Sequence, residues 1–215
     1  MIDRIATLLI VDDEPSIRES LSHVLTEIGY RVRSAEDGFS ALREIRHEVP
    51  DLLLSDLNMP NMSGFELLSV VRRRFPAIRT IAMSGSFSGD EVPSGVTADA
   101  FFEKGSSIRS LLRIIGGMAL SAPVPANDAT VSAPLWVQRK GNEDGGEPYV
   151  TILCPECLRT FPQAVGGTLS LAREANCIHC RSSVYYAIIE PVDWASARVS
   201  QKGSSELGHL TSPSY

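Results

Sequence analysis

The stretch DLLLSDLNMPNMSGFELL, residues 51–68, decides the fold. It opens on an unbroken apolar run, Leu52-Leu53-Leu54, which is typical of a strand buried on both faces of a sheet. The run ends at Ser55 and Asp56. After a loop, apolar side chains recur at helical spacing, at Phe65, Leu68, Val71 and Phe75. Pro76 then ends the helical pattern. The stretch is therefore predicted to be a buried strand followed by an amphipathic helix.

The same alternation of strand and helix extends in both directions. Strands are predicted over residues 7–11, 31–35, 78–83 and 100–103, and helices over residues 17–28, 41–49 and 108–115. Gly29, Pro50 and the pair Gly116-Gly117 stand where these helices are expected to end. Strands that alternate with helices indicate a parallel sheet covered on both faces, so residues 1–120 are predicted to form a doubly wound α/β domain.

Composition excludes several classes of protein. Hydrophobic residues make up 43% of the 215 residues and charged residues 21%, as in ordinary globular proteins. The formal net charge is -6, so the chain lacks the excess of basic residues that is typical of nucleic-acid-binding proteins. No apolar stretch approaches the ~20 residues of a membrane helix, and the N-terminus has no signal-peptide pattern. We therefore expect a cytoplasmic protein, in which structural disulfides are rare.

Acidic, hydroxyl and ammonium groups stand where the predicted strands end. The groups are Asp12 and Asp13 after the first strand, Asp56 after the third, Ser84 after the fourth and Lys104 after the fifth. In doubly wound sheets, ligands bind beyond these carboxyl ends. Any one Asp or Ser could be a helix cap, but five such groups at the strand ends are hard to explain by capping. Crowded carboxylates favour a cation such as Mg²⁺, and a lysine suits a phosphoryl oxygen.

With these motifs in place, residues 5–118 resemble the receiver domain of bacterial two-component response regulators. The resemblance rests on Val11-Asp12-Asp13-Glu14, on residues 56–64 with the pattern Asp-x-x-Met-Pro-x-Met-x-Gly, and on Ser84-Gly85 and Lys104. It implies a flavodoxin-like five-stranded parallel sheet with strand order 2-1-3-4-5. It also implies a phosphoprotein of a phosphorelay, whose partner is a sensor histidine kinase or a histidine phosphotransfer protein.

The resemblance further implies a role for each site residue. Asp56 would be the phosphoacceptor, and Ser84 and Lys104 would hold the phosphoryl oxygens. Mg²⁺ would be bound by Asp13, Asp56 and the backbone carbonyl of Asn58, with Asp12 acting through water. Phe101, three residues before the lysine, occupies the position of the aromatic switch residue, and it could at the same time be a core aromatic of a buried strand. Such a domain is not an enzyme, but it assists its own phosphorylation and dephosphorylation.

Two departures from the family pattern bear on the site. Gly105 stands where the family usually has a proline after its lysine, which makes the placement of Lys104 less constrained. Residues 86–97 replace what is usually a full fourth helix, and they contain Pro93, Gly89 and Gly95 with little apolar periodicity. At most a single helical turn is expected there, so the usual output face of the family is in doubt.

Composition shifts divide the rest of the chain. Residues 121–148 are rich in Ala, Pro, Ser, Gly and Asn, which predicts a flexible linker. Leu135-Trp136-Val137 could instead be a short anchor that docks on a neighbouring surface. Residues 149–195 are predicted to form a small module, and residues 196–215 a disordered tail.

The four cysteines form two Cys-x-x-Cys pairs, Cys154 with Cys157 and Cys177 with Cys180. This spacing is a strong zinc signature, because each loop points two thiolates at one centre. The module therefore resembles a zinc ribbon with a structural Zn²⁺. His179 could be a ligand, but four thiolates already close the site. Free thiols, a redox disulfide pair and rubredoxin-like iron are the alternatives, and Leu158 and Arg181 replace the glycines usual in rubredoxin-like loops.

The function of the module stays open between three classes. Residues 149–195 contain three arginines and four acidic residues, so they offer no basic stripe that could follow a phosphate backbone. The favoured hypothesis is a response regulator whose output is a protein–protein contact through the receiver or the ribbon, with an unknown output protein. A transcriptional regulator that binds DNA through the ribbon is the alternative. A rubredoxin-like electron carrier is the third.

Overall fold

The computed structural model describes residues 6–85, 97–119, 134–140, 149–165 and 173–189. Its first part contains β1 (Thr7–Val11), α1 (Pro15–Glu27), β2 (Arg31–Ala35), α2 (Gly38–His47), β3 (Leu52–Asp56), α3 (Gly64–Arg74), β4 (Arg79–Ser84), β5 (Ala100–Glu103) and α4 (Ile108–Ala119). The strands form a parallel sheet of order β2-β1-β3-β4-β5. The predicted doubly wound fold and its strand order are therefore confirmed.

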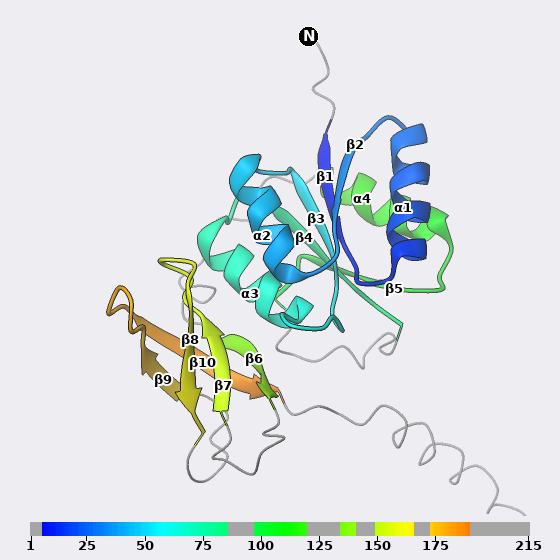
Figure 1. Ribbon diagram of the computed structural model, residues 1–215. Coiled ribbons are helices and arrows are strands. Elements are labelled where there is room, and N and C mark those ends of the chain that lie inside the picture. Colours follow the sequence, from blue (N-terminus) through cyan, green and yellow to red (C-terminus); the bar gives the residue numbers. More distant parts are fainter. Residues whose placement is uncertain (1–5, 86–96, 120–133, 141–148, 166–172, 190–215) are drawn as a thin grey trace, which may run out of the picture.

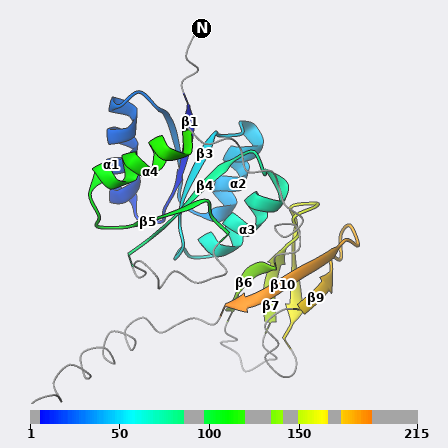
Figure 2. The same cartoon turned by 180° about the vertical axis from the view of Figure 1, so that it is seen from behind.

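Two apolar layers bury the faces of this sheet, with β3 at its centre. Leu53 belongs to the cluster beneath α2 and α3, whereas Leu52 and Leu54 belong to the cluster beneath α1 and α4. Figures 1 and 2 show these two pairs of helices on opposite faces. The loops at the strand ends are held by local caps: the side chain of Asp37 accepts a hydrogen bond from Ser40 N, and that of Ser63 from Glu66 N.

The last helix runs further than expected. The pair Gly116-Gly117 was predicted to end it at residue 115, but α4 continues through both glycines to Ala119. Met118, beyond the glycines, packs against the apolar cluster that contains Leu111 and Ile115. Burial of this side chain favours the added turn over the weak helix propensity of glycine.

The second part of the chain is a five-stranded sheet of order β8-β7-β6-β10-β9. Its strands are β6 (Leu135–Lys140), β7 (Tyr149–Leu153), β8 (Thr160–Ala164), β9 (Arg173–Asn176) and β10 (Ser183–Ile189). β6 pairs parallel with β10 and antiparallel with β7, so it joins two antiparallel hairpins into one sheet. The linker prediction for residues 121–148 is thus wrong for Leu135–Lys140. Outside the described residues lie the other parts of the predicted linker, residues 121–133 and 141–148. The segment 86–96 and the predicted tail, residues 196–215, also lie outside them.

The β module packs on α3. Every residue from Gly64 to Val71 is buried, because the sheet of the first part covers one side of α3 and β6 covers the other. Leu135 and Val137 of β6 belong to the same apolar cluster as Leu67 and Val70 of α3. This is the anchor that was the alternative to a linker, and Figure 1 shows the module against α3. Among the described residues, no helix is long and apolar enough to cross a membrane.

Candidate functional site

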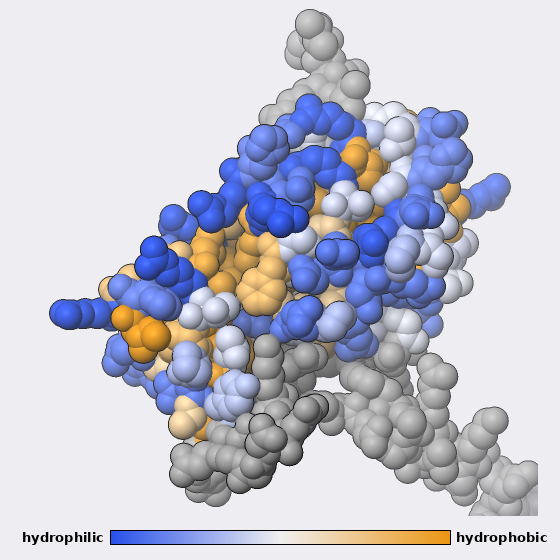
Figure 3. Space-filling view, in the orientation of Figure 1, coloured by the Kyte–Doolittle hydropathy of each residue, from blue (hydrophilic) through white to orange (hydrophobic). Residues whose placement is uncertain are grey.

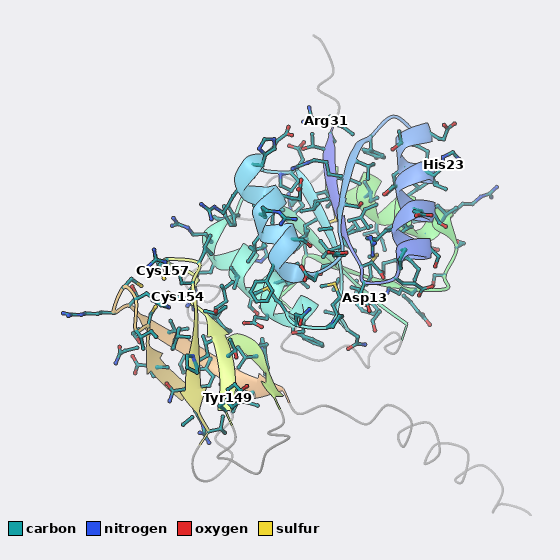
Figure 4. The ribbon with its side chains drawn as sticks, in the orientation of Figure 1. Asp13, His23, Arg31, Tyr149, Cys154 and Cys157 are labelled. Atoms are coloured by element: carbon teal, nitrogen blue, oxygen red, sulfur yellow. The ribbon has the colours of Figure 1, made fainter. Side chains whose placement is uncertain are left out.

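Three carboxylates meet at the carboxyl edge of the parallel sheet. Asp12 and Asp13 directly follow β1, and Asp56 is the last residue of the neighbouring β3. Each offers an oxygen, and these oxygens lie within 4.8 Å of one another. Asp12 is fully buried and Asp56 is 4% exposed, whereas Asp13 is exposed to solvent. Figure 4 shows Asp13 at this edge of the domain.

Lys104 links the two buried carboxylates. Its Nζ lies 2.7 Å from Asp12 Oδ2 and 2.7 Å from Asp56 Oδ2. The other carboxylate oxygens are held by the backbone: Glu14 N donates to Asp12 Oδ1 at 3.0 Å, and Asn58 N donates to Asp56 Oδ1 at 3.3 Å. The two acidic groups are therefore fixed in position, and each keeps one oxygen turned toward the ammonium.

The ionisation of this cluster is set by a balance of burial and charge. Burial raises the pKa of the Asp56 carboxyl above its ordinary value, and the hydrogen bond from Lys104 opposes part of that shift. Burial lowers the pKa of Lys104, but its bonds to Asp12 and Asp56 outweigh this and raise the pKa overall. Lys104 is therefore a charged ammonium beside the Asp56 carboxyl, and its charge offsets part of the cost of ionising that buried group.

The remaining predicted residues come from β4 and β5. Ser84 is the buried last residue of β4, and its carbonyl accepts a hydrogen bond from Lys104 N at 2.8 Å. This bond brings the end of β4 and the lysine together at the same edge. Gly105 adopts a φ of +94°, which glycine tolerates and proline cannot adopt. Phe101 is half-buried and packs on the cluster under α2 and α3, away from Phe102.

Gly64 has a steric role that the motif alone does not reveal. A Cβ at this position would lie 1.9 Å from the carbonyl oxygen of Asp56 and 2.8 Å from Leu57 Cα. In addition, Gly64 N donates to Leu57 O at 3.0 Å. The start of α3 therefore lies directly against the backbone of Asp56.

The donor set of the acidic site fits Mg²⁺. Hard cations of this kind take carboxylate and carbonyl oxygens. Asp12 Oδ2 is buried and contacts the Lys104 ammonium at 2.7 Å, and the oxygens of Asp12, Asp13 and Asp56 lie close enough together to share one bound cation.

A family model described as the response regulator receiver domain matches residues 8–115, half of the chain. The chain belongs to the response regulator receiver family. The match covers every element from β1 into α4, so the predicted resemblance is confirmed.

Individual receivers show the same extent of similarity. The response regulator TrrA from Thermotoga maritima, solved with Mg²⁺ and BeF, is 30% identical with a TM-score of 0.50; the match covers 53% of this chain and 99% of TrrA. TrrA has also been solved in complex with the histidine kinase ThkA, where the match covers 54% of this chain and all of TrrA. These similarities are to the receiver domain alone.

Two curated relatives are described as transcriptional. The probable transcriptional regulatory protein TcrX from Mycobacterium tuberculosis is 33% identical over 119 residues, so this chain spans about half of it; the match covers 51% of each chain. The transcriptional activator ExaE from Pseudomonas putida is 26% identical over 212 residues and 94% of each chain.

The four cysteines form a second site, beyond the receiver. Their sulfur atoms all lie within 4.8 Å of one another, with Cys154 Sγ 3.6 Å from Cys180 Sγ and Cys157 Sγ 3.7 Å from Cys177 Sγ. A tetrahedral metal with bonds of about 2.3 Å to sulfur requires edges of about 3.8 Å. The cluster therefore fits one tetrahedral metal ion, and Zn²⁺ would suit it. Figure 4 shows Cys154 and Cys157 at the end of the module nearest α3.

Two equivalent loops present these thiols. Leu158 N donates to Cys154 O and Arg181 N donates to Cys177 O, both at 2.9 Å. Leu158 and Arg181 adopt φ values of 54° and 63°, the left-handed conformation for which glycine is usual. Both cysteine loops therefore keep the left-handed backbone conformation although Leu158 and Arg181 stand where glycine is usual.

The surroundings of the thiols differ. Burial raises the pKa of the Cys154 thiol to about 12, whereas hydrogen bonds from Ser182 lower the pKa of Cys180 to about 6. His179 turns its Nε2 to Thr160 O at 3.0 Å and is not among the ligand residues of the four-cysteine cluster, although its backbone N donates to Cys177 Sγ at 3.4 Å.

One buried contact links the cysteine loops to the receiver, and sequence reasoning missed it. Leu153 N, one residue before Cys154, donates to Glu66 Oε1 of α3 at 3.3 Å. Glu66 is only 6% exposed. A signal was present in the sequence: Leu67 and Val70 add apolar side chains outside the predicted stripe, and a helix that is apolar on all sides is buried on all sides.

Proposed function

We propose that this chain is a phosphoacceptor response regulator in which Asp56 receives a phosphoryl group from a phosphohistidine. The observation that carries the proposal is the position of Lys104 Nζ, 2.7 Å from an oxygen of Asp56 and 2.7 Å from an oxygen of Asp12. In the transfer, an Asp56 oxygen bonds to phosphorus, the phosphorus–nitrogen bond breaks, and the imidazole leaves with the electron pair. The donor protein would be a sensor histidine kinase or a histidine phosphotransfer protein.

The residues around Asp56 would stabilise the transferred charge. Lys104 places a cation at the edge where phosphoryl oxygens develop negative charge, and Ser84 offers a hydroxyl from β4. Asp13, Asp56 and the Asn58 carbonyl would hold Mg²⁺, with Asp12 acting through water. Mg²⁺ held there would neutralise charge on the carboxylates and the phosphoryl oxygens.

These groups would also speed hydrolysis of the aspartyl phosphate, so the chain regulates its own phosphorylation without being an enzyme for another substrate. Phe101 would serve as the switch residue. A cytoplasmic location agrees with transfer from a kinase and remains a prediction.

The test of the acceptor is a single substitution. In Asp56→Asn, labelling by phosphoramidate in the presence of Mg²⁺ should disappear, because the amide has no nucleophilic oxygen. The substitution keeps the side-chain volume, and an unchanged circular dichroism spectrum checks the fold. Stoichiometric labelling of the folded variant would refute the assignment.

For the module, we propose a structural Zn²⁺ held by Cys154, Cys157, Cys177 and Cys180, with output through a protein contact. A closed four-thiolate site leaves no open position for substrate. Metal analysis of the purified chain should give one zinc per chain. Red ferric protein would instead favour the rubredoxin-like carrier.

DNA binding by the module is the second candidate, favoured by the description of ExaE as a transcriptional activator over 94% of both chains. Retention on heparin and a salt-dependent shift of promoter DNA would support it. We favour the protein contact because three arginines and four acidic residues balance each other between residues 149 and 195.

A further inference from the structure

A cleft opens between α2 of the receiver and the first cysteine loop of the β module. It has a volume of about 570 Å³, within the usual range for ligand sites. α2 supplies Phe39, Leu42, Arg43 and Arg46, whose spacing places them on one helix face, and the loop supplies Leu158 and Arg159. In Figure 3, apolar side chains gather where α2 meets the module, with hydrophilic side chains around them.

The charge of this cleft has no internal partner. No aspartate or glutamate lines it, and Arg43, Arg46 and Arg159 form no ion pair with any described residue. By contrast, Arg33 and Arg72, outside the cleft, are both paired with carboxylates. Three guanidinium groups without an ion-pair partner in the described part of the chain thus lie in one cleft of a protein with a net charge of -6.

The apolar lining defines the rest of the ligand. Phe39 is 41% exposed, so the cleft offers an aromatic surface that an apolar side chain of a partner could cover. Leu158 of the opposite wall is half-buried. The two walls belong to different parts of the chain, and the packing of α3 on β6 holds them together.

We propose that this cleft binds an acidic segment of a partner protein in which carboxylates alternate with large apolar residues. The carboxylates would pair with the guanidinium groups, which suit bidentate contacts, and an apolar side chain would cover Phe39. A peptide is favoured over nucleic acid because the guanidinium groups of the cleft are interleaved with apolar side chains, and residues 149–195 have more acidic than basic residues. The inference goes beyond the proposed function and does not depend on phosphorylation of Asp56.

The test uses the full chain with zinc and a fluorescein-labelled short peptide of alternating Asp and Leu or Phe residues. Fluorescence anisotropy should report saturable binding that weakens with salt. A peptide with Lys in place of Asp, and one with Ser in place of Leu and Phe, should each bind at least about tenfold more weakly. Absence of saturable binding by the acidic apolar peptide would overturn the proposal.

Matched variants locate the binding. R43E/R46E/R159E should weaken binding at least about tenfold, whereas R74E/R109E/R113E carries the same change of charge on exposed residues away from the cleft and should leave it unchanged. Phe39→Ala should weaken binding several-fold without loss of zinc. Equal losses in the two triple variants would overturn the proposal, and so would binding of a short DNA duplex in preference to the peptide.

Discussion

Replacing Gly64 with alanine should displace the backbone of Asp56, the proposed phosphoacceptor. The new Cβ would lie 1.9 Å from Asp56 O, although real Cβ contacts essentially never fall below 3.0 Å. The difference of these distances, 3.0 − 1.9 = 1.1 Å, is the least separation that the two segments must gain. The second contact, 2.8 Å to Leu57 Cα, is also with backbone, so rotation of a side chain cannot relieve the overlap.

The expected effect has a structural part and a chemical part. Forced overpacking in a buried site costs about 1–3 kcal/mol, and we expect a loss of this size in the free energy of unfolding. Misplacement of a reacting group by about 1 Å can lower a rate by about 100-fold, so labelling by phosphoramidate should slow by about that factor. The lysine and both carboxylates remain, which separates this effect from loss of a site residue.

Two other glycines serve as controls. Gly116 lies in α4 with nothing within 4 Å of the added Cβ, so Gly116→Ala should stabilise the protein by up to about 1 kcal/mol. At Gly38 the Cβ would meet Cγ and Sδ of the fully buried Met62 at 2.5 Å and its Cβ at 2.9 Å, so Met62 must shift. Because these contacts include no atom of Asp56, Gly38→Ala should slow labelling less than Gly64→Ala.

The measurements are urea unfolding and the initial rate of labelling with Mg²⁺ present. A Gly64→Ala variant with the stability of Gly116→Ala and the native labelling rate would refute the argument that α3 lies directly against the backbone of Asp56.

Three further predictions concern the metals and the module. Asp13→Ala should weaken Mg²⁺ binding at least about tenfold in calorimetry, while Glu14→Ala should not; equal effects would contradict the proposed ligand set. Cys177→Ser should release zinc, and limited proteolysis should then cut within the module. The reason is that zinc binding in such small modules supplies on the order of 10 kcal/mol of folding free energy. Retention of zinc together with resistance to the protease would argue against a structural metal. Val70→Asp places a charge in the buried face of α3, one turn beyond Glu66. It should lower the free energy of unfolding by more than about 3 kcal/mol. A loss below about 1 kcal/mol would mean that β6 leaves α3 in solution.

The receiver could be predicted closely because its patterns are local. Unbroken apolar runs such as Leu52–Leu54 mark strands buried on both faces, and the five strands of the sheet lie within a residue or two of the predicted ranges. The acidic site followed from topology, since parallel strands end at one edge and bring Asp12 and Asp56 together. The pairing of the cysteines into one cluster likewise followed from their spacing.

What could not be predicted depends on contacts between distant segments. Composition made residues 121–148 look like a linker, but Leu135 and Val137 gain burial by joining a sheet whose other strands come later in the chain. Likewise, Gly116-Gly117 looked like a helix end because local propensity does not include the burial of Met118. The position of Glu66 against Leu153 is a contact over 87 residues; the apolar side chains around α3 indicate that the helix is buried on all sides, but not which segment covers it.

The packing of α3 suggests how the two halves of the chain affect each other. Gly64 ties the start of α3 to the Asp56 backbone, and Glu66, two residues later, accepts a hydrogen bond from the residue before Cys154. A shift of the loop between Asp56 and α3 must therefore move the surface on which β6 and the first cysteine loop rest. Because coupling free energies are reciprocal, a partner that binds the module and favours one position of α3 should change the equilibrium between phosphorylated and free Asp56 in the same sense. We therefore propose that coupling between Asp56 and the module runs through α3, which contacts both of them.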